Sequence, residues 1–175
     1  MSHDDRLGDI IITEEEIEAK IDQLAAEINK DYAGKELVII GILKSSLYFL
    51  TDITRKLDLD IKIDFLEISH YADENSSGII RVTRDLEFSI SNKNVILIEN
   101  IINTGLTHSY LYKNLKARNP KSLKICTLLQ NKSKKLVELP VDYSGFEIED
   151  KFVVGYGLDY KENFRNLPYI AEYEL

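Results

Sequence analysis

A polar turn that follows an apolar strand is the segment of this chain with the clearest potential for chemistry. The apolar run Val95–Ile98 leads into Glu99 and Asn100, and the turn Asn103–Thr107 comes after two further apolar residues. Such a turn opens a helix, whose first backbone N–H groups lack intrahelical partners and attract anions. Gly105 permits close approach of the backbone, and the threonine hydroxyls can donate hydrogen bonds. The segment therefore suits a phosphate monoester, and Glu99 is placed to accept hydrogen bonds from sugar hydroxyls.

The same residues also fit a purely structural role. Asn103-Thr104-Gly105 can simply turn the chain and cap the helix that follows. Spacing alone leaves the two interpretations open. His108 lies in the first turns of that helix, and we expect it to be exposed rather than catalytic.

The elements that must position this turn alternate between helix and strand. Thr13 and Glu16 predict a capping box, after which apolar residues recur at helical spacing up to Ile28. Further helices are expected at 47–57 and 106–118, and residues 69–78 are expected to form a loop. Strands are expected at 37–43, 61–65, 79–83, 95–98, 122–129 and 152–154, with 61, 63 and 65 on one face. This order predicts an α/β fold with a mainly parallel sheet, which places ligands at the carboxyl ends of its strands.

Composition limits the class of protein. A chain of 175 residues with 44% hydrophobic and 30% charged residues suits one globular domain, residues 1–175. The net charge of −8 argues against duplex nucleic acid as a partner, because such binding needs clustered Lys and Arg. The lone Cys126 excludes an internal disulfide and is expected to be a buried thiol. No apolar run approaches the ~18 residues of a membrane span, so we expect a cytoplasmic protein without a membrane partner.

Several motifs of the chain resemble those of a known family. The segment 95–107 is similar to the phosphoribosyl pyrophosphate (PRPP) signature of the phosphoribosyltransferases, which has two acidic residues after the strand and then Asp-Thr-Gly and Thr. Gly41-Ile-Leu-Lys44 resembles the pyrophosphate loop of that family. The segments 141–148, 150–160 and 165–169 resemble the hypoxanthine-guanine branch in particular. The resemblance extends from about residue 11 to residue 170.

The resemblance implies a fold and a reaction. The fold is the type I phosphoribosyltransferase fold, a mostly parallel central sheet flanked by helices with a small cap, or hood, formed by the N-terminal segment and the last third of the chain. In the reaction a purine base displaces pyrophosphate from PRPP with the help of Mg²⁺ and gives a purine nucleoside monophosphate. The implied ligands are thus PRPP, the purine base and the nucleotide, and the implied assembly is a homo-oligomer, either a dimer or a tetramer.

The resemblance also assigns roles to residues. The 5′-phosphate would be held by Asn103, Thr104, Gly105, Leu106 and Thr107, and the ribose would face Glu99 and Asn100. The pyrophosphate would contact Lys44, Ser45 and Arg165. The purine would contact Asn131, Phe152, Val153 and Asp159, with Phe152 stacking on the ring. Magnesium would be held by Asp159 and Glu99, and the lid would carry Ser69, His70 and Tyr71. Taken alone, Phe152 and Val153 also fit a core strand, and Asp159 and Arg165 a surface ion pair.

The chain departs from the family pattern at the site itself. Asn100 replaces the second acid of the pair, and Asn103 replaces the aspartate thought to exchange the purine imidazole proton. Ser45 replaces a glycine of the pyrophosphate loop, and Asn131 replaces a purine-reading lysine. On the lid, His70 takes the place of a serine.

These departures lead to two hypotheses. An amide lacks the basicity of a carboxylate, and removal of a general base costs ~10²–10⁴-fold in rate. The first hypothesis is a purine salvage enzyme with impaired turnover. The second is an inactive paralogue that binds PRPP or purine nucleotides as a sensor or partner subunit. Because Asn100 and Asn103 are both expected on a polar turn, changing either to aspartate is expected to leave the stability of the fold almost unchanged.

Overall fold

A six-stranded sheet forms the centre of the molecule. The computed structural model describes residues 5–71 and 79–175, except for the side chains of residues 70, 71 and 79. The strand order is β4-β3-β2-β5-β6-β7, and every neighbouring pair is parallel except β3 with β4. The strands are β2 (Leu37–Leu43), β3 (Ile61–Tyr71), β4 (Ile79–Arg84), β5 (Asn94–Ile102), β6 (Ser122–Gln130) and β7 (Tyr143–Glu147). Residues 37–40 and 95–98 are buried in the middle of this sheet, as the uninterrupted apolar runs predicted.

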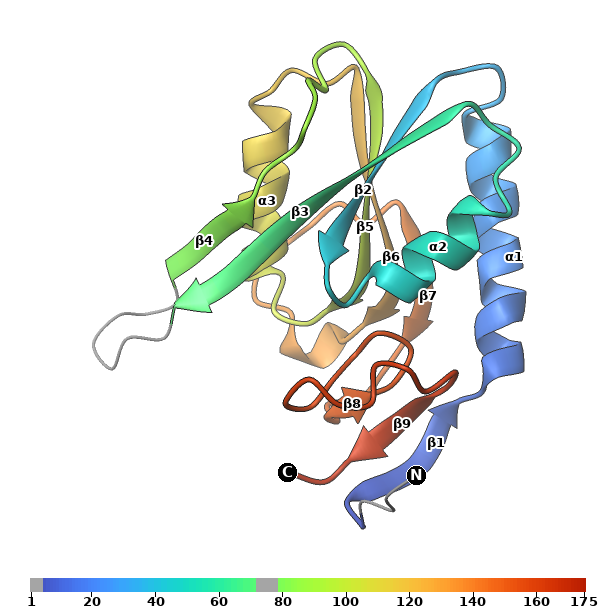
Figure 1. The fold of residues 1–175 in the computed structure, drawn as a ribbon, viewed down its shortest axis with the longest axis vertical. Coiled ribbons are helices and arrows are strands. Elements are labelled where there is room, and N and C mark those ends of the chain that lie inside the picture. The colour runs from blue at the N-terminus through green and yellow to red at the C-terminus, as the bar shows by residue number, and fades with distance from the viewer. Residues whose placement is uncertain (1–4, 72–78) are drawn as a thin grey trace.

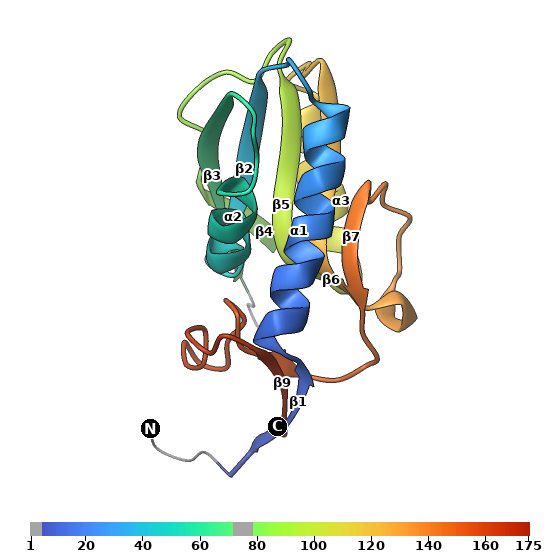
Figure 2. The same cartoon turned by 90° about the vertical axis from the view of Figure 1, so that its right-hand side faces the viewer.

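Helices cover both faces of the sheet (Figures 1 and 2). On one face α1 (Glu14–Asp31) and α2 (Leu47–Thr54) pack against Ile96 and Ile98 of β5. On the other face α3 (Leu106–Lys116) packs against Val95 and Leu97. The predicted capping box of α1 is present, since Thr13 N–H donates to Glu16 at 2.8 Å and Glu16 N–H donates to the Thr13 hydroxyl at 3.3 Å. Both α2 and α3 end earlier than predicted, at residues 54 and 116. In the described part of the chain no helix is long and apolar enough to cross a membrane.

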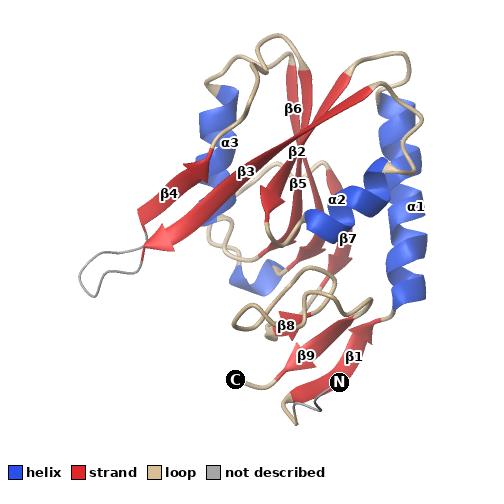
Figure 3. Ribbon diagram, in the orientation of Figure 1, coloured by secondary structure: helices blue, strands red, loops and turns tan. Residues whose placement is uncertain are grey.

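A second, three-stranded sheet lies beyond the carboxyl ends of β2 and β5 (Figure 3). It consists of β1 (Leu7–Ile12), β9 (Ile170–Tyr173) and β8 (Val153–Val154), all antiparallel. The prediction of a small cap from the N-terminal segment and the last third of the chain is therefore confirmed. The prediction that residues 152–154 complete the main sheet is wrong, because β7 occupies the position next to β6 and leaves β8 to pair with β9.

The buried face of β3 is the opposite of the one that we predicted. The alternating apolar residues led us to expect Ile63 on the buried face, but its exposed fraction is 41%, whereas that of Asp64 is 3%. The Asp64 carboxylate accepts from Phe65 N–H and Glu87 N–H, each at 2.8 Å, and the second of these bonds ties the turn that follows β4 to β3. The predicted loop 69–78 is also partly wrong, because residues 69–71 belong to β3; residues 72–78 lie outside the described part.

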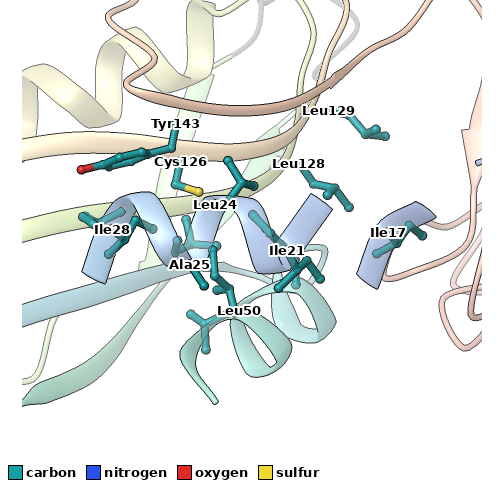
Figure 4. Packing of buried hydrophobic residues seen from close by; sticks show 14 of the residues in the cluster. Ile17, Ile21, Leu24, Ala25, Ile28, Leu50, Cys126, Leu128, Leu129 and Tyr143 are labelled. Carbon is teal, nitrogen blue, oxygen red and sulfur yellow. The ribbon is translucent and has the colours of Figure 1, made fainter. Parts of the chain in front are cut away.

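Cys126 is a buried thiol, as predicted. It lies on β6 in the core beneath α1, near Ala25 and Tyr143 (Figure 4), and none of its surface is exposed. Burial away from water raises the pKa of its thiol far above the ordinary range. Because only the thiolate is reactive, we expect no modification by a water-soluble disulfide reagent at pH 8 in the native protein. One thiol per chain should react after unfolding in guanidinium chloride. Rapid reaction of the native protein would contradict this packing.

Candidate functional site

A cavity of about 560 Å³ lies between the carboxyl ends of the central strands, the start of α3 and the C-terminal part of the chain. Five segments of the chain contribute to its wall: the end of β2 and its loop, β3, β5, the turn before α3, and the hood segment, by which we mean residues 155–165. Its lining residues include Lys44, Ser45, Glu99, Asn103, Thr104, Gly105, Thr107, Asp159 and Arg165. The fold therefore gathers most of the predicted site residues in one place, at the sheet edge where α/β proteins bind ligands.

The turn Asn103–Thr107 forms part of the wall of this cavity. Gly105 is the N-cap of α3 and has a φ of +79°, a left-handed conformation that glycine adopts without strain. The Thr104 carbonyl accepts from Leu136 N–H at 3.0 Å, which ties the turn to the segment after β6. Asn103 is exposed to the cavity, and in the described part of the chain its side chain has no hydrogen-bond partner. The turn thus presents the first amides of α3 and the Thr107 hydroxyl to an anion.

Glu99 is a buried carboxylate in the wall of the cavity, with an exposed fraction of 5%. One oxygen accepts from the Ser45 hydroxyl at 2.9 Å and from Asn100 N–H at 2.7 Å. The other lies 3.0 Å from Nε2 of His108 on α3. His108 is only 8% exposed, so the expectation that it is solvated is wrong. Its position in the first turn of α3 directs it back toward β5, a consequence of helix geometry that its place in the sequence already indicated.

Lys44 and Arg165 form the cationic side of the cavity. Lys44 Nζ lies 3.1 Å from the Glu162 carboxylate, and Arg165 lies 2.8 Å from Asp159 and 3.5 Å from Glu162. The hydrogen bond from Lys44, followed by the charge of Arg165, lowers the pKa of Glu162. Asp159 also accepts from Glu162 N–H at 2.8 Å. Glu162, which the sequence did not single out, therefore bridges the two cations that an oxyanion ligand would meet.

Asn100 does not face the cavity. It belongs to β5 and is completely buried, which corrects the expectation that it lies on a polar turn. The reason is the alternation of side chains along a strand. Residues 95 and 97 face α3 and residues 96 and 98 face α1, so Glu99 continues toward α3 and Asn100 toward the opposite face.

Of the four residues predicted to contact the purine, Asp159 lines this cavity and the other three lie outside it. Asn131 is buried and caps the short 3₁₀ helix η1 (Lys132–Lys134) by accepting from Lys134 N–H at 3.2 Å, while its amide donates to Glu149 O at 3.3 Å. Phe152 is partly exposed and packs edge-to-face on Tyr160, and Val153 is buried in β8.

Of the remaining predicted residues, Leu106 is exposed at the start of α3. Ser69 lies on β3 opposite Arg81, and the side chains of residues 70 and 71 lie outside the description.

Asp159 and Glu99, the two carboxylates that the resemblance implies as magnesium ligands, both line the cavity. In the described part of the chain no three His, Cys, Asp or Glu side chains gather as a metal site would need. Mg²⁺ commonly takes only one or two carboxylates and completes its shell with phosphate and water. Both oxygens of each carboxylate already have partners, but the Asp159 side chain is 27% exposed whereas Glu99 is only 5% exposed, so Asp159 is the more accessible ligand.

Comparison with known proteins finds similarity over the whole of this architecture. The family model for the phosphoribosyl transferase domain matches residues 9–161. The hypoxanthine-guanine phosphoribosyltransferase of Bacillus subtilis is 42% identical over 172 residues, which cover 98% of this chain and 94% of that protein. The corresponding protein of Dictyostelium discoideum is 44% identical over 169 residues, 94% of each chain.

Two solved structures are similar in the same way. A hypoxanthine-guanine phosphoribosyltransferase from Bacillus anthracis has a TM-score of 0.90 and 39% identity, over 97% of this chain and 99% of that chain. A hypoxanthine phosphoribosyltransferase from Staphylococcus aureus has a TM-score of 0.92 and 40% identity, over 97% and 93% of the two chains. The similarity includes the main sheet as well as the hood segment.

Proposed function

The chain belongs to the hypoxanthine-guanine phosphoribosyltransferases, a family of pentosyltransferases, and from this premise we propose that it transfers the phosphoribosyl group of PRPP to hypoxanthine or guanine at a reduced rate. The expected type I phosphoribosyltransferase fold is confirmed. The observation that carries the proposal is a single cavity whose wall contains both an anion-binding turn and two cations, Lys44 and Arg165. PRPP has an anion at each end, a 5′-phosphate and a pyrophosphate.

At the anomeric carbon the proposed reaction forms a C–N bond and breaks a C–O bond. A purine nitrogen attacks this carbon, pyrophosphate leaves with the electron pair of the C–O bond, and the imidazole N–H loses its proton to solvent, because the amide of Asn103 cannot accept it. The turn 103–107 holds the 5′-phosphate, Glu99 faces the ribose, and Lys44 and Arg165 neutralise the leaving pyrophosphate. Ser45 lies within the pyrophosphate loop and orients Glu99. The purine ring stacks on Phe152, and its edge meets the backbone of Val153 and the loop at Asn131.

Magnesium fits the proposal as a partner of the pyrophosphate. A bound Mg²⁺ would neutralise pyrophosphate charge, and Asp159 is the carboxylate of this chain best placed to hold it. Arg165, which is paired with Asp159, supplies a second positive charge to the same part of the site. The lid role of Ser69, His70 and Tyr71 and assembly as a homodimer or homotetramer are parts of the same proposal.

The reduced rate follows from Asn103. Its side chain reaches the cavity without any partner in the described part of the chain, at the position where the family has its proton-exchanging aspartate. An amide accepts a hydrogen bond there but takes up no proton. The same observation favours the second candidate function, a protein that binds PRPP or a purine nucleotide without turning it over. Pyrophosphate release from PRPP, Mg²⁺ and hypoxanthine or guanine, measured with the unaltered chain, separates the two.

Both functions require the phosphate site. We expect saturating GMP to raise the melting temperature by roughly 5–10 °C, since a ligand at 100 times its Kd contributes about 2.7 kcal/mol. Thr107→Val removes a hydroxyl from the turn and should diminish this shift. Thr51→Val makes the same change on the exposed side of α2 and should leave the shift intact. Guanosine, which lacks the phosphate, should protect far less. Equal protection by guanosine and GMP would show that the turn does not hold the phosphate.

A further inference from the structure

The side-chain amide of Asn100 joins two segments that are far apart in the sequence. Its Nδ2 donates to the Ser45 carbonyl at 3.1 Å and to the Tyr156 carbonyl at 2.6 Å. Ser45 belongs to the loop after β2, and Tyr156 belongs to the hood segment. Asn100 itself sits near the end of β5, in the middle of the main sheet. One buried nitrogen therefore fastens both segments to the rigid centre of the fold.

The two segments carry the cationic side of the cavity. Lys44 precedes Ser45, and Arg165 is held to the hood by two hydrogen bonds with Gly157, one from its guanidinium to Gly157 O at 2.7 Å and one from Gly157 N–H to its carbonyl at 2.9 Å. The segments also touch directly, because a Cβ atom on Gly157 would lie 2.1 Å from the Ser45 carbonyl oxygen. The place of Lys44 and Arg165 relative to the phosphate turn thus depends on this junction.

The chemistry of the junction requires an amide at position 100. Two carbonyl oxygens face the side chain, and each needs a donor. The NH₂ group of asparagine supplies two hydrogens from one atom, whereas a carboxylate supplies none. The carbonyls also fix the orientation of the amide, and its Oδ1 atom is buried without a partner in the described part of the chain. An aspartate here would place a negative charge against two carbonyl oxygens in a buried site.

We propose that Asn100 is a positioning residue, whose amide holds the Lys44–Ser45 loop and the hood segment in the arrangement that binds pyrophosphate. Asparagine at this position is then not a lost acid, because it has a task that the acid cannot perform in this chain. The assignment of pyrophosphate to Lys44 and Arg165 rests on the proposed function, but the junction itself does not.

The experiment compares the same isosteric change at two positions. Asn100→Asp is predicted to lower the affinity for inorganic pyrophosphate at least about tenfold, the equivalent of one lost buried hydrogen bond of about 1.4 kcal/mol. The affinity for GMP, measured in the same titration calorimetry series, should fall less, because the junction contains no residue of the turn 103–107. Asn92→Asp, on the exposed turn before β5 and outside the cavity, is the matched control and should leave both affinities within about threefold.

Hydrogen exchange tests the junction without any ligand. In Asn100→Asp the amides of residues 44–46 and 155–165 should exchange at least about tenfold faster, whereas those of α1 should keep their protection. If this variant does not fold, Asn100→Ser, which retains one uncharged donor, takes its place and should show the same pattern to a smaller degree. Unchanged exchange in both segments would overturn the proposal. So would an equal loss of GMP and pyrophosphate affinity, which indicates a general structural role. If the unaltered chain binds no pyrophosphate while the exchange pattern appears, the proposed function fails and the junction stands.

Discussion

Asn103→Asp is expected to accelerate purine-dependent release of pyrophosphate by at least ~10²-fold, the lower end of what a general base contributes. The carboxylate would supply a group able to take the imidazole proton, at the position to which the resemblance assigns the proton-exchanging aspartate. Asn103 is exposed to the cavity, and in the described part of the chain its side chain makes no hydrogen bond that the change would break. Stability should therefore change by less than about 0.5 kcal/mol. Steady-state assays with PRPP, Mg²⁺ and either base measure the effect.

The control for this prediction is Asn103→Ser, which is polar but supplies no base. It should leave turnover at the level of the unaltered chain, and GMP affinity should change far less than rate in both variants. Equal turnover of the unaltered chain and Asn103→Asp would show that another group moves the proton. No turnover in either protein would direct attention to Ser45, whose hydroxyl occupies an oxygen of Glu99, and would favour the binding-protein function.

Gly157→Ala is expected to destabilise the protein by about 2–5 kcal/mol and to abolish pyrophosphate binding. The residue has a φ of +95°, which costs an L-amino acid about 1–2 kcal/mol. The added Cβ would also lie 2.1 Å from the Ser45 carbonyl oxygen and 3.1 Å from Asn100 Nδ2, and such overpacking costs about 1–3 kcal/mol. Both neighbours belong to the junction between the loop and the hood. A melting temperature lower by roughly 5–15 °C should follow.

Gly34→Ala is the control that separates the effect of backbone strain from the effect of the close contact between residue 157 and the Ser45 carbonyl. Gly34 has a φ of +69°, but nothing lies within 4 Å of the Cβ that alanine would add. The free energy of unfolding of this variant should fall only by the roughly 1–2 kcal/mol that a left-handed backbone costs an L-amino acid. The variant should bind pyrophosphate as the unaltered chain does. If the two variants were equally stable and both bound pyrophosphate, Ser45 and Gly157 would not be in the close contact described above.

Local features of the sequence were sufficient for most of the framework. The capping box at Thr13 and Glu16 began α1 where expected, because both partners lie within one turn of each other. The apolar runs at 37–43 and 95–98 became central strands, because a strand covered on both faces needs apolar residues throughout. The turn at Gly105 opened α3, because its left-handed backbone favours glycine. Motif resemblance then supplied the family, which the comparisons confirm.

The sequence indicated only in part toward which face each polar residue points. Glu99 and Asn100 are adjacent in the sequence, and strand alternation alone indicates that they cannot both face one cavity. We expected the polar turn to begin at this pair and therefore did not apply the alternation to it. The strand β5 in fact continues to Ile102, so the alternation holds for both residues. The same kind of error placed Ile63 inside and Asp64 outside, since an apolar side chain was assumed to mark the buried face.

The partners of these residues were decided by the tertiary structure alone. Asn100 meets carbonyls that lie 55 and 56 positions away, and Lys44 meets a glutamate 118 positions away. Asn131 caps a short helix and does not line the cavity, because its side chain is held by Lys134 N–H and the Glu149 carbonyl. The types and spacing of residues determined that this chain could hold a phosphate at a helix start. Whether a given asparagine contacts the ligand or stabilises the fold depended on which distant backbone groups the fold placed next to it. A hydrogen bond requires contact in space, and separation along the sequence does not reveal that contact.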